Sequence, residues 1–137
     1  GVKISDGAQF NTIGGTTEGE RNIISGNRGA GIHIADLGTS AIVSGNYIGT
    51  DVNGTTALGN GGDGVIVQSG AQLNVIGGTT ADERNVISGN DGRGISIEDP
   101  CILHWFCKKC AKNTLSGFIS LLDYKENEES GNEKKGR

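Results

Sequence analysis

The sequence predicts an all-β protein whose chain coils as a parallel β-helix (β-solenoid), and three observations support this fold class. Glycine makes up 25 of the 137 residues, more than twice its usual share of about 7%. Short runs rich in Ile and Val recur between Gly, Asn, Asp and Thr, and these runs are too short for helices. The chain also repeats itself, which is the sequence signature of a solenoid.

The repeat has a period of 63 residues. Alignment of residues 1–34 with residues 64–97 gives 22 identical pairs in 34. The differences keep apolar character, as where Phe10 becomes Leu73 and Ile23 becomes Val86. A buried strand position requires this behaviour, so we expect these side chains to lie inside the coil.

Within the 63-residue period, β-branched runs divide the chain into five expected rungs of about 20 residues. The runs begin at Val2, Ile23, Ile42, Val65 and Val86. The expected rungs are residues 1–20, 21–40, 41–63, 64–83 and 84–99. Each rung would coil once and stack its strands in parallel on the next at about 4.8 Å, so that inward Ile and Val side chains form aliphatic ladders.

The sequence Ser-Gly-Asn recurs after three of these runs, at residues 25–27, 44–46 and 88–90. Gly and Asn tolerate the positive φ that a corner between strands demands. We therefore expect Asn27, Asn46 and Asn90 to form one hydrogen-bonded ladder along a corner of the coil. The alternative is that these three side chains form a ligand-binding array.

Longer phrases carry a family resemblance. NTIGGTTEGERNIISGN, AIVSGNYIGTDVNGTTALGNGGDGVIV and NVIGGTTADERNVISGN resemble the repeats of right-handed parallel β-helix proteins of the pectin-lyase-like type, as found in bacterial surface and secreted proteins. The resemblance covers residues 1–99 and implies a right-handed coil and an extracellular or cell-surface location. It leaves the activity open, because this architecture serves polysaccharide lyases, hydrolases, epimerases and non-catalytic adhesive stalks.

The charged residues of the repeat do not predict a catalytic site. Polysaccharide hydrolysis needs two carboxylates on one face, and a lyase needs a base beside carboxylates that hold Ca²⁺. Arg21 and Arg84 occupy the same repeat position, each directly after a glutamate. Because a catalytic group occurs once in a site, we interpret Glu20–Arg21 and Glu83–Arg84 as turn residues that make salt bridges between rungs.

Three other features of the repeat suggest binding chemistry only weakly. His33 alternates with two isoleucines and is expected to point outward without a role. The segment from Asp51 to Gly54, with GNGGDG (59–64) and GNDGRG (89–94), resembles calcium loops but lacks their spacing. The threonine pairs recur too irregularly for an ice-binding face and fit a wider corner. We assign no cofactor.

Composition bounds the partners of the chain. Residues 1–99 carry 11 acidic and 5 basic side chains, a net charge of −6, which disfavours binding to nucleic acid. No apolar run approaches the ~20 residues of a membrane span. A polysaccharide or a cell-surface protein is the expected partner.

Residues 100–137 form a non-repeat tail that is expected to be partly disordered. The tail holds all three cysteines, and its candidate metal ligands are Cys101, His104, Cys107 and Cys110. Zinc or an iron–sulfur cluster is disfavoured, because structural sites separate their ligand pairs by a dozen residues or more. The tail is either a cap on the last rung or a segment foreign to the repeat.

The sequence therefore favours a non-catalytic structural or adhesive β-helix module of a larger extracellular protein, with carbohydrate as a candidate ligand. The alternative is a fragment of a polysaccharide lyase or hydrolase whose catalytic rungs are missing here. The absence of Met and a start inside a rung indicate a piece of a longer protein.

Overall fold

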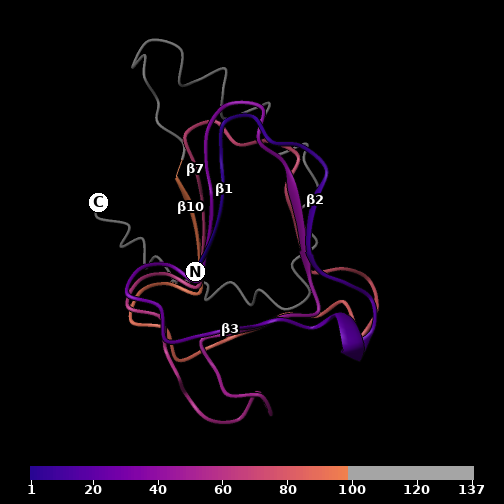
Figure 1. Ribbon diagram of the computed structural model, residues 1–137, viewed down its shortest axis with the longest axis vertical. Coiled ribbons are helices and arrows are strands. Elements are labelled where there is room, and N and C mark those ends of the chain that lie inside the picture. The colour runs from indigo at the N-terminus through magenta and orange to yellow at the C-terminus, as the bar shows by residue number, and fades with distance from the viewer. Residues whose placement is uncertain (99–137) are drawn as a thin grey trace, which may run out of the picture.

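The computed structural model describes residues 1–98, which form a β-solenoid of about three turns, as the fold-class prediction expected. Viewed end-on, successive turns superpose as a three-sided outline (Figure 1). In chain order the elements are β1 (Val2–Ile4), β2 (Asn11–Gly14), the 3₁₀ helix η1 (Glu18–Glu20), β3 (Ile23–Ile24), β4 (Ile32–Ile34), β5 (Ala41–Ser44), β6 (Tyr47–Ile48), β7 (Val65–Gln68), β8 (Val75–Ile76), β9 (Val86–Ile87) and β10 (Ile95–Glu98).

Each side of the coil is one parallel sheet. Sheet A has the order β1-β4-β7-β10, sheet B has β2-β5-β8, and sheet C has β3-β6-β9. Every strand pairs with the equivalent strand one turn away. The chain thus passes through A, B and C in turn before it returns to A.

The pairing register shows that a turn is longer than the expected rung. Val2 pairs with Ile32, Ile32 with Val65, and Val65 with Ile95, so successive turns contain 30, 33 and 30 residues. The expected five rungs of about 20 residues are therefore about three turns, and the 63-residue repeat is a pair of them. We call residues 2–31 turn 1, residues 32–64 turn 2 and residues 65–94 turn 3.

The expected aliphatic ladders fill the inside of the coil. One ladder stacks Ile13 on Val43 and Val43 on Ile76 within sheet B. The buried apolar residues are Ile4, Ile13, Ile24, Ile32, Ile34, Ala41, Val43, Ile48, Val65, Val67 and Ile76. Each large side chain buried in this way contributes about 1.5–3 kcal/mol.

Some apolar positions of the repeat lie outside the coil, which corrects the expectation that they are buried. Phe10 is 92% exposed, Leu73 79% and Ile23 41%. Phe10 and Leu73 also have left-handed φ values, 58° and 55°; Phe10 directly precedes β2, and Leu73 lies two residues before β8. The repeat preserves outward positions as well as inward ones, so conserved apolar character did not distinguish them.

Candidate functional site

The predicted asparagine ladder exists as two ladders rather than one. At the corner between sheets C and A, Asn27 donates from Nδ2 to Oδ1 of Asn60, and Asn60 donates in the same way to Asn90, both at 2.7 Å. Asn60 is fully buried and also donates to the carbonyl oxygen of Ile24. The side-chain amides of these asparagines thus form hydrogen bonds with one another and with the backbone.

Asn46 belongs to the second ladder, at the corner between sheets B and C. Asn22 donates to Oδ1 of Asn46 at 3.0 Å, and Asn46 donates to Oδ1 of Asn85 at 3.1 Å. The expected grouping of Asn46 with Asn27 and Asn90 is therefore wrong. The tripeptide Ser-Gly-Asn occurs at two different corners, so its recurrence could not say which asparagines stack.

The glutamates of the repeat close the corner loops between sheets B and C. Glu20 accepts hydrogen bonds at Oε2 from the hydroxyl of Thr17 and from the backbone N–H groups of Thr16 and Thr17, at 2.9–3.0 Å. Glu83 accepts the equivalent bonds. The Thr17 hydroxyl and these backbone N–H groups lower the pKa of Glu20 from its ordinary value, because they stabilise the charged form.

The salt bridges expected between rungs are not the ones observed. Arg21 pairs instead with Glu18 of its own turn, at 3.4 Å. No ion pair involves Glu20, Glu83 or Arg84 among residues 1–98. The loop threonines hold Oε2 of Glu20 and of Glu83, so both carboxylates are directed into their own loops.

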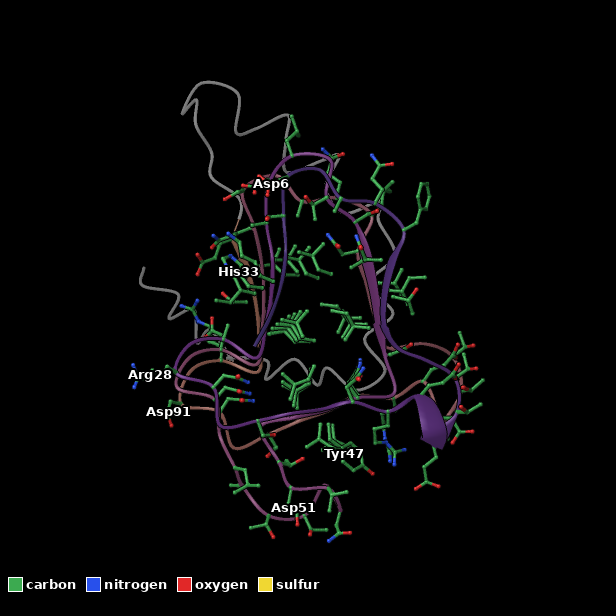
Figure 2. All side chains as sticks on the ribbon, viewed as in Figure 1. Asp6, Arg28, His33, Tyr47, Asp51 and Asp91 are labelled. Carbon is green, nitrogen blue, oxygen red and sulfur yellow. The ribbon has the colours of Figure 1, made fainter. Side chains whose placement is uncertain are left out.

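Arg21 instead connects two turns through an aromatic ring that the sequence reasoning overlooked. Its guanidinium carbon lies 4.3 Å from the ring centroid of Tyr47, and its Nε–H donates to the carbonyl oxygen of Gly45 at 3.2 Å. Tyr47 lies on the outside of the coil (Figure 2). Such a cation–π contact is worth about 0.5–1 kcal/mol at an exposed site.

Turn 2 carries a projecting loop at residues 50–57, which Thr50 and Ala57 close as an antiparallel bridge. Asp51 accepts hydrogen bonds at Oδ1 from the backbone N–H groups of Thr56 and Thr55, and these lower its pKa. The carboxylate thus orders its own loop. Residues 1–98 contain no cluster of three or more His, Cys, Asp or Glu side chains that could hold a metal ion.

His33 points outward, as expected, between the fully buried side chains of Ile32 and Ile34. Its strand neighbours are Lys3 and Ile66. Its Nε2 atom is buried and has no hydrogen-bond partner in the described part of the chain. The candidate metal ligands Cys101, His104, Cys107 and Cys110 lie outside the described residues.

One region of the surface exposes several large apolar side chains without basic residues among them. It covers the corner between sheets A and B and the outward face of sheet B. We call it the apolar corner; it consists of Phe10, Leu37, Ile42 and Leu73, with exposed fractions of 92%, 74%, 46% and 79%. Exposed apolar patches of this kind commonly mark interaction sites.

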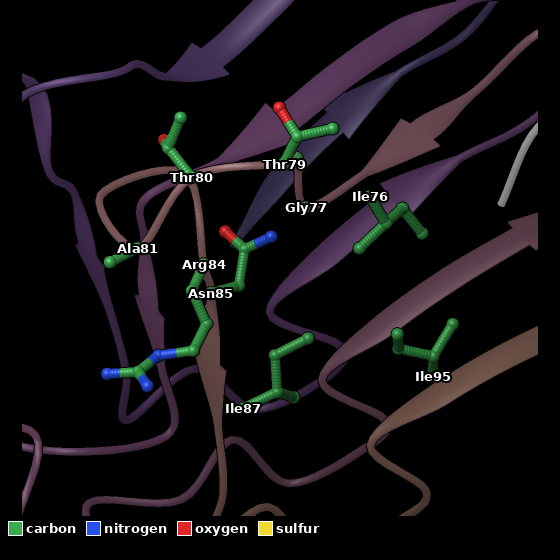
Figure 3. A pocket seen from close by; sticks show the side chains of 10 residues that line it. Ile76, Gly77, Thr79, Thr80, Ala81, Arg84, Asn85, Ile87 and Ile95 are labelled. Atoms are coloured by element: carbon green, nitrogen blue, oxygen red, sulfur yellow. The ribbon is translucent and has the colours of Figure 1, made fainter. Parts of the chain in front are cut away.

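A cavity of about 320 Å³ lies at the end of the coil formed by turn 3 (Figure 3). Its apolar wall consists of Ile76, Ile87 and Ile95, with Ala81. Arg84 and Asn85 supply polar groups beside them. Every lining residue belongs to turn 3 or to β10.

These features define a β-solenoid with three parallel sheets, two asparagine ladders, an exposed apolar corner and a cavity at one end. Comparison with family models, curated proteins and solved structures gives no match to this chain. Within residues 1–98 there is no helix long and apolar enough to cross a membrane.

Proposed function

We propose that the chain is a non-catalytic structural and adhesive module of a larger extracellular protein, and that it binds carbohydrate through the apolar corner. The observation that supports this proposal is that the repeated glutamates of the chain form hydrogen bonds within their own corner loops. Glu20 and Glu83 both close their own loops by hydrogen bonds to threonines. They therefore support the coil, which suits a rigid spacer.

The extracellular setting and the right-handed, pectin-lyase-like type of coil belong to the same proposal. The phrases around residues 11–27, 41–67 and 74–90 support them by their resemblance to surface and secreted repeat proteins. Stacking that extends over three turns through three sheets and two ladders supports the mechanical role, because each turn is bonded to the next on all three sides and at two corners.

The apolar corner supports the choice of carbohydrate. The ring of Phe10 is almost fully exposed and can pack against the apolar face of a sugar ring. Gln9 and Gln72 flank the corner on turns 1 and 3 and are also exposed, so their amides can hydrogen-bond to hydroxyl groups. Ligand sites commonly combine apolar contact area with a few polar groups in this manner.

Binding to insoluble polysaccharides, measured by co-sedimentation of the full chain, tests the proposal. We expect Phe10→Ala to weaken binding at least several-fold, because it removes the exposed ring. Val52→Ala is the matched control, since Val52 is 70% exposed but lies on the loop of turn 2. Equal effects of the two variants, or no binding by the parent chain, would contradict the carbohydrate role.

A second assay addresses the enzymatic alternative. The chain is incubated with pectin, alginate and related uronate polymers, and release of unsaturated or reducing ends is measured. We expect no release. Activity that disappears when a single carboxylate is replaced by its amide would instead identify a polysaccharide lyase or hydrolase.

A further inference from the structure

The turns of the coil are of two kinds that alternate. Turns 1 and 3 have a long corner between sheets B and C, formed by residues 15–21 and 78–84, which contain the T-T-x-x-E loop. Turn 2 has a short corner there, Ser44-Gly45-Asn46, and places its extra residues in the loop 50–57. We call the first kind long-corner turns and the second kind short-corner turns.

The contact between turns 1 and 2 shows how a long-corner turn binds the short-corner turn that follows it in the stack. Asn22 donates to Oδ1 of Asn46 from both its backbone N–H and its Nδ2, at 3.2 and 3.0 Å. Arg21 donates to the carbonyl oxygen of Gly45 and stacks on the ring of Tyr47. The short-corner turn supplies every acceptor in this set.

Turn 3 offers the same groups on the face that points away from turn 2. Arg84 and Asn85 are the repeat equivalents of Arg21 and Asn22, and both line the cavity of about 320 Å³ (Figure 3). Ile87 of the same face is only partly buried, whereas its equivalent in turn 1 is covered by turn 2. Among the described residues, β8 and β9 are the last strands of their sheets.

The long corners on both sides closely enclose a short corner, as Gly45 shows, and a long-corner turn lacks one of the groups that the short-corner turn supplies. A Cβ atom at Gly45 would lie 2.7 Å from the carbonyl oxygen of Gly15 and 2.8 Å from that of Asp82, so the long corners on both sides close over it. The register of sheet B, counted on from Ser44, places Gly15 opposite Gly45, and the register of sheet C, counted back from Tyr47, places Arg21 and Arg84 there, so the extra residues of a long corner lie between these two points. A long-corner turn has Ile23 or Val86 in place of Tyr47, so it offers no aromatic ring to Arg84.

From this complementarity we infer that the face of turn 3 is a binding site for one further β-helical turn of the short-corner kind. The incoming turn would supply a Gly carbonyl and a tyrosine ring to Arg84, an asparagine Oδ1 to Asn85, and apolar side chains to the cavity. β10 already has the register of the first strand of such a turn, because Ile95 pairs with Val65 as Ile32 does. This inference is independent of what the apolar corner binds.

Two insertions into the full chain after Glu98 test the inference. The first inserts a copy of residues 36–64, which completes a short-corner turn from β10. The second inserts a copy of residues 69–94, which completes a long-corner turn from the same strand. We expect the first to raise the midpoint of thermal unfolding by at least about 5 °C and the second to leave it unchanged or lower.

The contribution of Arg84 provides the second readout. We expect Arg84→Ala to lower the midpoint of the short-corner variant and to leave the parent chain and the long-corner variant unaffected. We also expect exchange of the Arg84 Nε–H proton to slow only in the short-corner variant. Equal stabilisation by both insertions, no stabilisation by the short-corner turn, or an equal effect of Arg84→Ala in all three chains would overturn the inference.

Discussion

Alanine at Gly45 is expected to destabilise the coil much more than alanine at Gly26. Both glycines have left-handed φ values, 70° and 69°, so a side chain at either position costs about 1–2 kcal/mol in backbone strain. Only Gly45 is enclosed. Its Cβ would lie under 3 Å from two carbonyl oxygens of the neighbouring turns, whereas nothing lies within 4 Å of a Cβ at Gly26.

The enclosure adds a steric cost at Gly45, because the turns on both sides must move apart. Overpacking of this kind costs about 1–3 kcal/mol. We therefore expect Gly45→Ala to lower the free energy of unfolding by about 2–5 kcal/mol and Gly26→Ala by about 1–2 kcal/mol. In a domain of this size each kcal/mol lowers the thermal midpoint by roughly 4–8 °C.

Urea unfolding followed by far-UV circular dichroism measures both losses, provided that the slope with urea concentration stays the same. Gly19→Ala serves as a further control, because a Cβ there meets nothing within 4 Å and its φ is not left-handed. We expect it to change the free energy of unfolding little. Equal losses at Gly45 and Gly26 would refute the steric argument.

Three further substitutions test other parts of the structure. Because hydrogen bonds within its loop lower the pKa of Glu83 below its ordinary 4.5, the ionised group stabilises the fold above about pH 4.5 and this contribution is lost as the pH falls through the folded-state pKa. We therefore expect Glu83→Gln to weaken the dependence of the midpoint of thermal unfolding on pH at acid pH, and Asp82→Asn in the same loop to leave this dependence unchanged. Matching curves for the two variants would contradict this role of Glu83. Ile48→Ala should cost about 2–5 kcal/mol in urea unfolding because Ile48 is fully buried, whereas Ile42→Ala on the outward face should cost clearly less. Asn60→Ala should cost about 1–3 kcal/mol by the same measurement, because it leaves buried ladder partners without a hydrogen bond, and a negligible loss would show that the ladder is dispensable.

The fold class could be predicted from the sequence because it depends on local patterns that the repeat confirms. Short β-branched runs separated by glycine-containing corners are typical of the strands of any solenoid, and their repetition along the chain indicates a coil whose turns stack on one another. The turn length could not be predicted in the same way. The runs at Val2, Ile23 and Ile42 look alike locally but belong to sheets A, C and B, and only pairing between distant residues tells them apart.

The contacts of the candidate site show the same limit. The role of Glu20 as a structural residue could be predicted from its recurrence, but its partner could not, because a glutamate beside an arginine suggests an ion pair. The stacking of Arg21 on Tyr47 joins residues of two unequal turns. The register between β3 and β6 brings the two residues together, and their spacing in the sequence does not predict this contact.

The direction of the hydrogen bonds has a mechanical consequence. Strands pair only with strands one turn away, so the backbone bonds between turns run along the axis of the coil. A pull along this axis loads the successive interfaces in series, and within one interface the three sheets and both ladders share the force in parallel. The breaking force of such a rod is set by its weakest interface and does not grow when turns are added, whereas its reach grows with every turn.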